Sequence, residues 1–156
     1  MVIQRWQSVL LLVASIMMAC FTFSSLGQVQ TQDYSLNFTT LGFTYEGISA
    51  NYAPGSYFLS TVYLFILSLT TSVLILLDIF LFKNLRLQKQ VCLISILFII
   101  ASAAVAAGIG YTSVEGYYVS WSSMALCPLL AVIACIYAFS CMRRDERRLK
   151  AVDRLR

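Results

Sequence analysis

Residues 91–111 read VCLISILFIIASAAVAAGIGY and contain no charged side chain. A helix needs roughly 20 apolar residues to cross the hydrocarbon core of a bilayer, so this stretch predicts a transmembrane helix. Three further stretches have the same character and contain no Lys or Arg; they are residues 6–26, 57–82 and 119–142. The sequence therefore predicts an all-α membrane protein, a four-helix transmembrane bundle formed by residues 1–156 as a single domain.

The composition of the whole chain agrees with this class. Of its 156 residues, 60% are apolar and only 12% are charged, and the mean hydropathy is +0.80. An average soluble domain is about 45–50% apolar and about 25% charged. A globule built from this chain would have too little charged surface to remain in water, which excludes an ordinary soluble domain.

The Lys and Arg residues predict how the chain is oriented. All 11 lie before the first span, between the second and third spans, or in residues 143–156 after the fourth span. The segments on the opposite side carry only acidic charges, at Asp33, Glu46 and Glu115. Because cytoplasmic loops are enriched in Lys and Arg, we expect a multi-pass protein of the inner (cytoplasmic) membrane with both termini in the cytoplasm.

The first span allows a second interpretation. Arg5, followed by an apolar run that reaches Cys20, resembles the basic start and short apolar core of a lipoprotein signal. Met17 and Met18 fit a processing site poorly, and the apolar character continues beyond Cys20. We therefore interpret this segment as a membrane span.

Residues 27–56 and 112–118 are predicted to form a small extracytoplasmic cap. Within the first segment, residues 34–41 and 43–46 alternate polar and apolar side chains on either side of Gly42, which predicts a β-hairpin. The second segment would add a third strand. A lone hairpin is marginally stable in water, so we expect the cap to lie on the helix ends. It would either close the bundle or bind a partner or ligand.

A run of small residues in the third span predicts close helix packing. The candidate packing face consists of Ala103, Ala107, Gly108 and Gly110. Lipid tails are as apolar as Leu, so membrane helices associate by close packing, which small residues permit. We expect the third span to lie at the bundle centre, with a homodimer or partner face as the alternative. In the fourth span, Pro128 predicts a kink that leaves a cavity beside this helix.

Asp78 is the only charged residue inside a predicted span. An ionisable residue in a span is by default a candidate functional residue. Asp78 lies five residues before Lys83, about 7.5 Å along a helix, so we expect it to pair with Arg5, Lys83 or the basic tail. The alternative is a proton or cation relay. The candidate cytoplasmic polar base comprises Arg5, Asp78, Lys83, Arg86, Asp145, Asp153 and Arg154.

Residues 143–156 contain seven basic and three acidic residues and are predicted to extend the fourth span as a basic cytoplasmic helix. The mixed charges favour a solvated helix at the membrane face over a purely lipid-binding polybasic patch. Docking to an acidic partner or to anionic lipid is the alternative, and nucleic acid is not an expected partner.

Catalysis is not predicted. The chain contains no His, and none of its five cysteines forms a CxxC pair. His is the commonest general base, and zinc sites need clustered Cys and His ligands. We therefore expect no enzyme activity, no metal and no cofactor.

Three separated segments resemble one family. They read MVIQRWQSVLLL at residues 1–12, FKNLRLQKQVCL at 82–93 and RDERRLKAVDRLR at 144–156. Over its whole length the chain is similar to the Domain of Unknown Function 4293 family of small four-span inner-membrane proteins of Bacteroidota. The family's usual Ser-Ala before the last Asp-Arg-Leu-Arg is replaced here by Ala151-Val152. The resemblance implies an inner-membrane protein without an assigned activity and suggests a role at the cytoplasmic face.

The sequence favours a non-catalytic scaffold or accessory subunit of a membrane complex. The small-residue run and the polar base motivate this interpretation, and its partners would be the lipid bilayer and either another protein or a second copy of the chain. The alternative is binding or transport of a lipid or another small apolar molecule, motivated by the cavity expected beside Pro128.

Overall fold

The computed structural model describes residues 2–30, 35–46, 57–81, 84–112 and 120–153. Within these residues the protein is mostly helical, and four helices are long and apolar enough to cross a membrane. They are α1 (Val2–Phe23), α2 (Val62–Phe80), α3 (Leu85–Thr112) and α4 (Cys127–Asp153). The prediction of four apolar helices with a small antiparallel sheet is confirmed.

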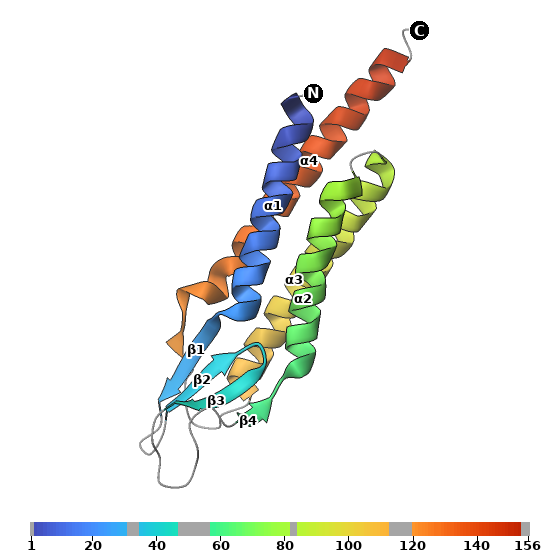
Figure 1. Cartoon of the computed structure of the whole chain (residues 1–156). Coiled ribbons are helices and arrows are strands. Elements are labelled where there is room, and N and C mark those ends of the chain that lie inside the picture. Colours follow the sequence, from blue (N-terminus) through green and yellow to red (C-terminus); the bar gives the residue numbers. More distant parts are fainter. Residues whose placement is uncertain (1, 31–34, 47–56, 82–83, 113–119, 154–156) are drawn as a thin grey trace.

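The helices form an elongated bundle (Figure 1). Both α1 and α3 pack against α2 and α4, so the four helices form a ring. About 33% of the apolar stretch of each of α2, α3 and α4 is buried inside the protein. The third span therefore does not occupy the centre, contrary to the expectation from its small residues.

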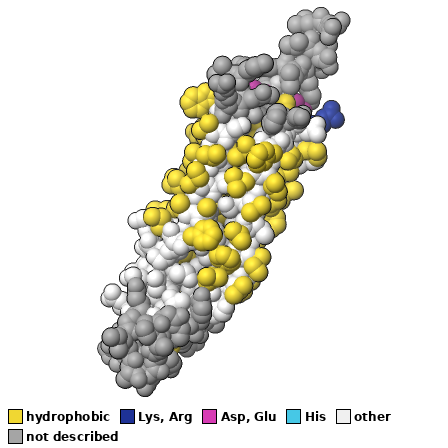
Figure 2. All heavy atoms as spheres, in the orientation of Figure 1, with side chains coloured by type: hydrophobic (Ala, Val, Ile, Leu, Met, Phe, Trp, Pro, Cys, Tyr) yellow, Lys and Arg dark blue, Asp and Glu magenta, His cyan; other side chains and the backbone are white. Residues whose placement is uncertain are grey.

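The two ends of the bundle differ. The start of α1, the end of α2, the start of α3 and the end of α4 lie together at one end, which we call the basic end (Figure 1). The strands lie at the other end, which we call the sheet end. The last turns of α4 extend past the start of α1. Between the two ends, hydrophobic side chains cover the visible face of the helices (Figure 2). A soluble monomer rarely exposes such a large contiguous apolar surface.

The interior of the bundle contains hydroxyl groups as well as apolar side chains. The Ser15 hydroxyl on α1 donates a hydrogen bond to the carbonyl oxygen of Ser72 on α2, at 3.5 Å. In return, the Ser72 hydroxyl donates to the carbonyl oxygen of Ser15, at 3.3 Å. Both residues are buried. Such reciprocal interhelical hydrogen bonds hold neighbouring membrane helices together.

In the described residues the sheet has five antiparallel strands in the order β4-β3-β2-β1-β5. Their bounds are Ser25–Gln30 for β1, Ser35–Thr39 for β2, Gly42–Glu46 for β3, Tyr57–Ser60 for β4 and Ser120–Trp121 for β5. The predicted hairpin is confirmed as β2 and β3. Gly42 has a φ of 142° as the chain leaves the turn, a conformation that favours glycine.

The sheet is larger than predicted because three of its strands include residues assigned to spans. Ser25 and Leu26 belong to β1 rather than to the first span, and residues 57–60 form β4 rather than the start of the second span. A short apolar run fits a buried strand as well as a helix. β5 (Ser120–Trp121) lies in residues assigned to the fourth span. Of the segment 112–118 in which a third strand was predicted, Thr112 ends α3 and the rest lies outside the described residues.

Pro128 does not kink α4. It is the second residue of that helix, preceded by a short 3₁₀ helix, η2 (Ser123–Leu126). In the first turn of a helix the backbone N–H has no partner within the helix, so proline is tolerated there. The prediction of a kink inside the fourth span was therefore wrong, because the helix begins later than the apolar run.

Candidate functional site

The structure describes the side chains of three of the seven residues in the predicted polar base: Asp78, Arg86 and Asp145. Among the described residues, no hydrogen bond or ion pair joins these three to one another. Arg5 lies on α1 and Asp153 on α4, but their side chains are outside the described residues. Lys83 and Arg154 are also outside the described residues.

Among the described residues, two side-chain contacts to α4 help to hold the basic end together. The side-chain amide of Gln7 on α1 donates a hydrogen bond to the carboxylate of Asp145 on α4. Lys89 on α3 forms an ion pair with Glu146, also on α4. Gln7 is buried, so its amide depends on a protein partner. The sequence-based prediction placed Asp145 in the polar base but did not include Gln7. The sequence marks Gln7 only as an amide side chain just inside an apolar run.

Asp78 is fully buried near the end of α2. Neither of its carboxylate oxygens has a hydrogen-bond partner among the described residues. The amide nitrogen of Gln88 on α3 donates to the backbone carbonyl of Asp78 at 3.3 Å. The Gln88 amide oxygen is itself buried and has no hydrogen-bond partner in the part of the chain that the structure describes. An isolated carboxylate in an apolar interior is costly, so Asp78 is the most unusual polar group that the structure describes.

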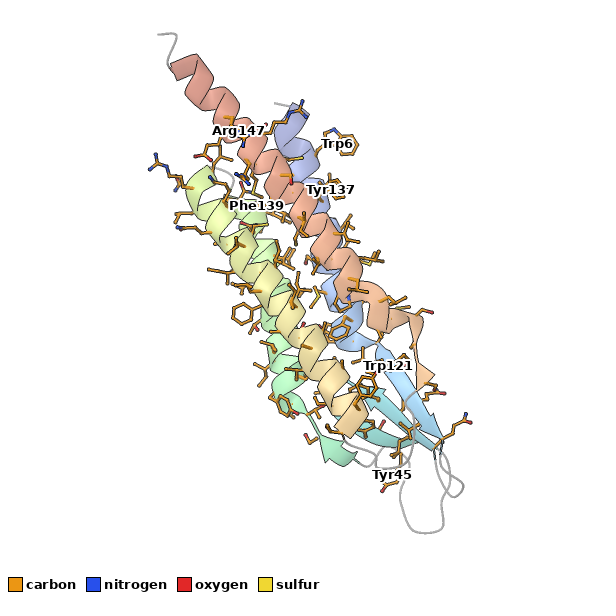
Figure 3. All side chains as sticks on the ribbon, turned by 180° about the vertical axis from the view of Figure 1, so that it is seen from behind. Trp6, Tyr45, Trp121, Tyr137, Phe139 and Arg147 are labelled. Carbon is orange, nitrogen blue, oxygen red and sulfur yellow. The ribbon has the colours of Figure 1, made fainter. Side chains whose placement is uncertain are left out.

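A cavity of about 520 Å³ lies at the sheet end between α1, α3 and η2, and we call it the sheet-end groove. It is lined by Phe21, Ala103, Ala106, Ala107, Tyr111, Trp121, Ser122, Ser123, Ala125 and Leu126. Figure 3 shows Trp121 near the end of α3, beside the sheet. A Cβ atom on Gly110 would lie only 2.7 Å from the Trp121 ring, so the glycine is what allows the ring to lie against α3. The groove is therefore bounded by small residues on one helix and by aromatic rings.

The predicted small-residue face is divided between two sides of α3. Ala103 and Ala107 line the sheet-end groove, and Gly110 lies under Trp121. Gly108 instead points outward, where an added Cβ would meet no atom within 4 Å. Because small residues occur all around this part of α3, the sequence alone does not indicate which side of the helix faces the bundle.

The outward side of α3 carries exposed residues spaced alternately four and three apart. These residues, which we call the α3 seam, are Leu97, Ala101, Ala104, Gly108 and Tyr111. This spacing is the repeat by which two helices pack along their length. The three central positions are small, which lets the backbone of a second helix approach closely.

The comparisons with known proteins agree with the resemblance seen in the sequence. A family model described as a domain of unknown function (DUF4293) matches residues 3–155. No curated protein matches the chain. Because the family match covers nearly the whole sequence, the protein belongs to the DUF4293 family.

Proposed function

We propose that the protein is a non-catalytic accessory subunit of a larger membrane complex and that a transmembrane helix of its partner packs along the α3 seam. The observation that carries this proposal is the alternating four-and-three spacing of exposed residues with Ala101, Ala104 and Gly108 at its centre. The charge distribution supports insertion in the inner membrane with both termini in the cytoplasm.

The α3 seam is exposed and contributes little to the fold of the chain itself, apart from Tyr111, whose ring centre lies 6.5 Å from that of Trp121. The opposite side of α3 provides the contacts to the bundle, with Cys92, Ile99 and Ala106 buried there. A glycine inside a helix costs about 1 kcal/mol relative to alanine. A Cβ atom added at Gly108 would meet no atom within 4 Å, so the packing of the isolated protein leaves room for alanine there and does not require glycine. Close approach of a second helix supplies a physical reason for glycine at this position.

Substituting Gly108→Leu is expected to reduce recovery of the partner by about tenfold, which corresponds to a loss of about 1.4 kcal/mol of binding free energy. The leucine side chain would hold the partner helix away from α3, while the space outside Gly108 leaves the fold intact. The measurement is crosslinking and pull-down from native membranes, with the tagged protein at its natural abundance.

The matched control is Thr70→Leu, which places leucine at an exposed position on α2. It should leave partner recovery unchanged. Equal recovery from the Gly108→Leu and unaltered proteins would show that no helix docks along the α3 seam. A crosslinked product of twice the chain mass would identify the partner as a second copy.

A second candidate function is the binding of a lipid chain or another small apolar molecule in the sheet-end groove. Its volume of about 520 Å³ lies within the range of about 300–1,000 Å³ typical of ligand pockets. Its lining is mostly alanine and aromatic side chains, with hydroxyls at Tyr111, Ser122 and Ser123. Such a lining suits an apolar chain with few polar contacts.

The substitution Ala107→Phe is expected to fill part of the sheet-end groove and to lower the amount of co-purified apolar molecule by about tenfold. Native mass spectrometry of the protein released from gentle detergent measures the bound mass directly. Ser140→Phe adds the same ring at an exposed position on α4 outside the groove and should retain the molecule. An unaltered protein that carries no bound molecule would exclude this second function.

A further inference from the structure

A second hollow, of about 420 Å³, lies between α3 and α4 at the basic end. We call it the α3–α4 groove, and it is lined by Arg86, Lys89, Gln90, Leu93, Phe139, Arg143 and Glu146. Figure 3 shows the neighbourhood of Phe139, where α4 passes the start of α3. The groove shares no residue with the α3 seam or with the sheet-end groove.

The charge of the α3–α4 groove is strongly positive. It contains three cationic side chains and one carboxylate, and the ion pair between Lys89 and Glu146 accounts for one charge of each sign. Arg86 and Arg143 are both exposed. In the part of the chain that the structure describes, neither of them forms an ion pair with an acidic side chain. Two guanidinium groups are therefore available to an anion at the mouth of the groove.

The position of Arg143 is held by an aromatic ring. Its guanidinium carbon lies 6.0 Å from the centre of the Phe139 ring, within the range of a cation–π interaction. This contact keeps the charge over the groove. A guanidinium also presents paired N–H donors that match the oxygens of a phosphate group.

The walls of the groove are apolar on the side away from the basic end. Leu93 lies seven residues after Arg86 on α3, about 10 Å further along the helix. It is half exposed, and the half-buried Phe139 faces it from the lining contributed by α4. The groove therefore presents positive charge at its mouth and hydrocarbon below it. This arrangement matches an amphiphile better than a free anion, which would leave the apolar wall uncovered.

We propose that the α3–α4 groove binds one anionic phospholipid from the leaflet at the basic end. The lipid phosphate lies between the guanidinium groups of Arg86 and Arg143, and an acyl chain lies along Leu93 and Phe139. Basic pockets between transmembrane helices are suited to anionic lipid headgroups. This site is independent of partner docking at the α3 seam, so either proposal can fail without the other.

The test compares lipid retention by native mass spectrometry after reconstitution in bilayers of phosphatidylethanolamine with or without phosphatidylglycerol. The double variant Arg86→Gln/Arg143→Gln is expected to retain about tenfold less phosphatidylglycerol, with unchanged retention of phosphatidylethanolamine. The matched control is Arg144→Gln/Arg147→Gln, which removes the same two charges from exposed positions on α4 outside the groove. The control should retain phosphatidylglycerol as the unaltered protein does.

Two results would overturn the proposal. The first is an equal loss of phosphatidylglycerol in both double variants, which would show a general attraction of the basic end rather than a site. The second is full displacement of the lipid by soluble glycerol phosphate, which would show that the groove recognises a free phosphate. The conservative variant Arg86→Lys tests the site without a change of charge: reduced retention supports paired guanidinium contacts, and wild-type retention contradicts them.

Discussion

Replacing Phe38 by alanine is expected to lower the free energy of unfolding by about 3–5 kcal/mol. Phe38 is fully buried on β2 and stacks on Phe43, with the ring centres 4.5 Å apart. Its ring also meets the edge of Trp121 at a centre-to-centre distance of 6.2 Å. Removing the phenyl group leaves a cavity beneath the sheet and takes away the support of Trp121.

Two measurements test the Phe38→Ala prediction. Denaturation in detergent micelles gives the loss of stability, and the fluorescence of Trp121 in a Trp6→Phe background reports the change in its surroundings, since the chain has two tryptophans. Gln30→Ala changes an exposed residue of β1 and should stay within about 0.5 kcal/mol of the unaltered protein. Identical midpoints for Phe38→Ala and Gln30→Ala would mean that the sheet does not unfold together with the bundle.

Substituting Asp78→Asn is expected to raise the free energy of unfolding by about 3 kcal/mol, the upper part of the range for an unpaired buried polar group. The carboxylate is buried without a hydrogen-bond partner in the described residues, whereas an amide of the same shape carries no charge. The amide can also donate a hydrogen bond to a neighbouring acceptor. The shift in the unfolding midpoint in detergent measures the gain.

Asp145→Asn is the control for Asp78→Asn. The Asp145 carboxylate already accepts a hydrogen bond from Gln7, so its replacement should give no gain. A fall in stability for Asp78→Asn would show that Asp78 is paired with a cation, as the sequence-based interpretation with Arg5 or Lys83 requires. A gain would mean that the protein retains an acid that weakens its fold, and such residues are commonly kept for function.

The helices could be predicted from the sequence because their signal is local. An uninterrupted apolar run of about 20 residues is sufficient to identify a span. The alternation around Gly42 was sufficient to identify the hairpin. By contrast, β1 and β4 are recognisable only through their partners: β1 pairs with β5, where Gly27 lies opposite Trp121. No pattern within a short window contains that information, so Ser25, Leu26 and residues 57–60 were assigned to spans.

The polar contacts between helices were the hardest to predict. Asp145 belonged to the predicted base, but its partner Gln7 lies at the other end of the chain. The two faces of α3 could not be separated either, because residues 103–108 contain small side chains all around the helix. Gly108 faces outward and Gly110 lies against Trp121 because of where the neighbouring elements lie, which the sequence of α3 does not specify.

The pairing of β1 with β5 has a consequence for biogenesis. The ribosome adds about 5–20 residues per second, so the roughly 90 residues between these strands take on the order of 5–20 s to synthesise. During that interval α1 has neither α4 beside it nor Asp145 to accept the hydrogen bond of Gln7. α1 can therefore complete its packing only after α4 has been synthesised. An insertase that binds α1 until translation ends would contact the Gln7 amide and the face of α1 that later packs against α4.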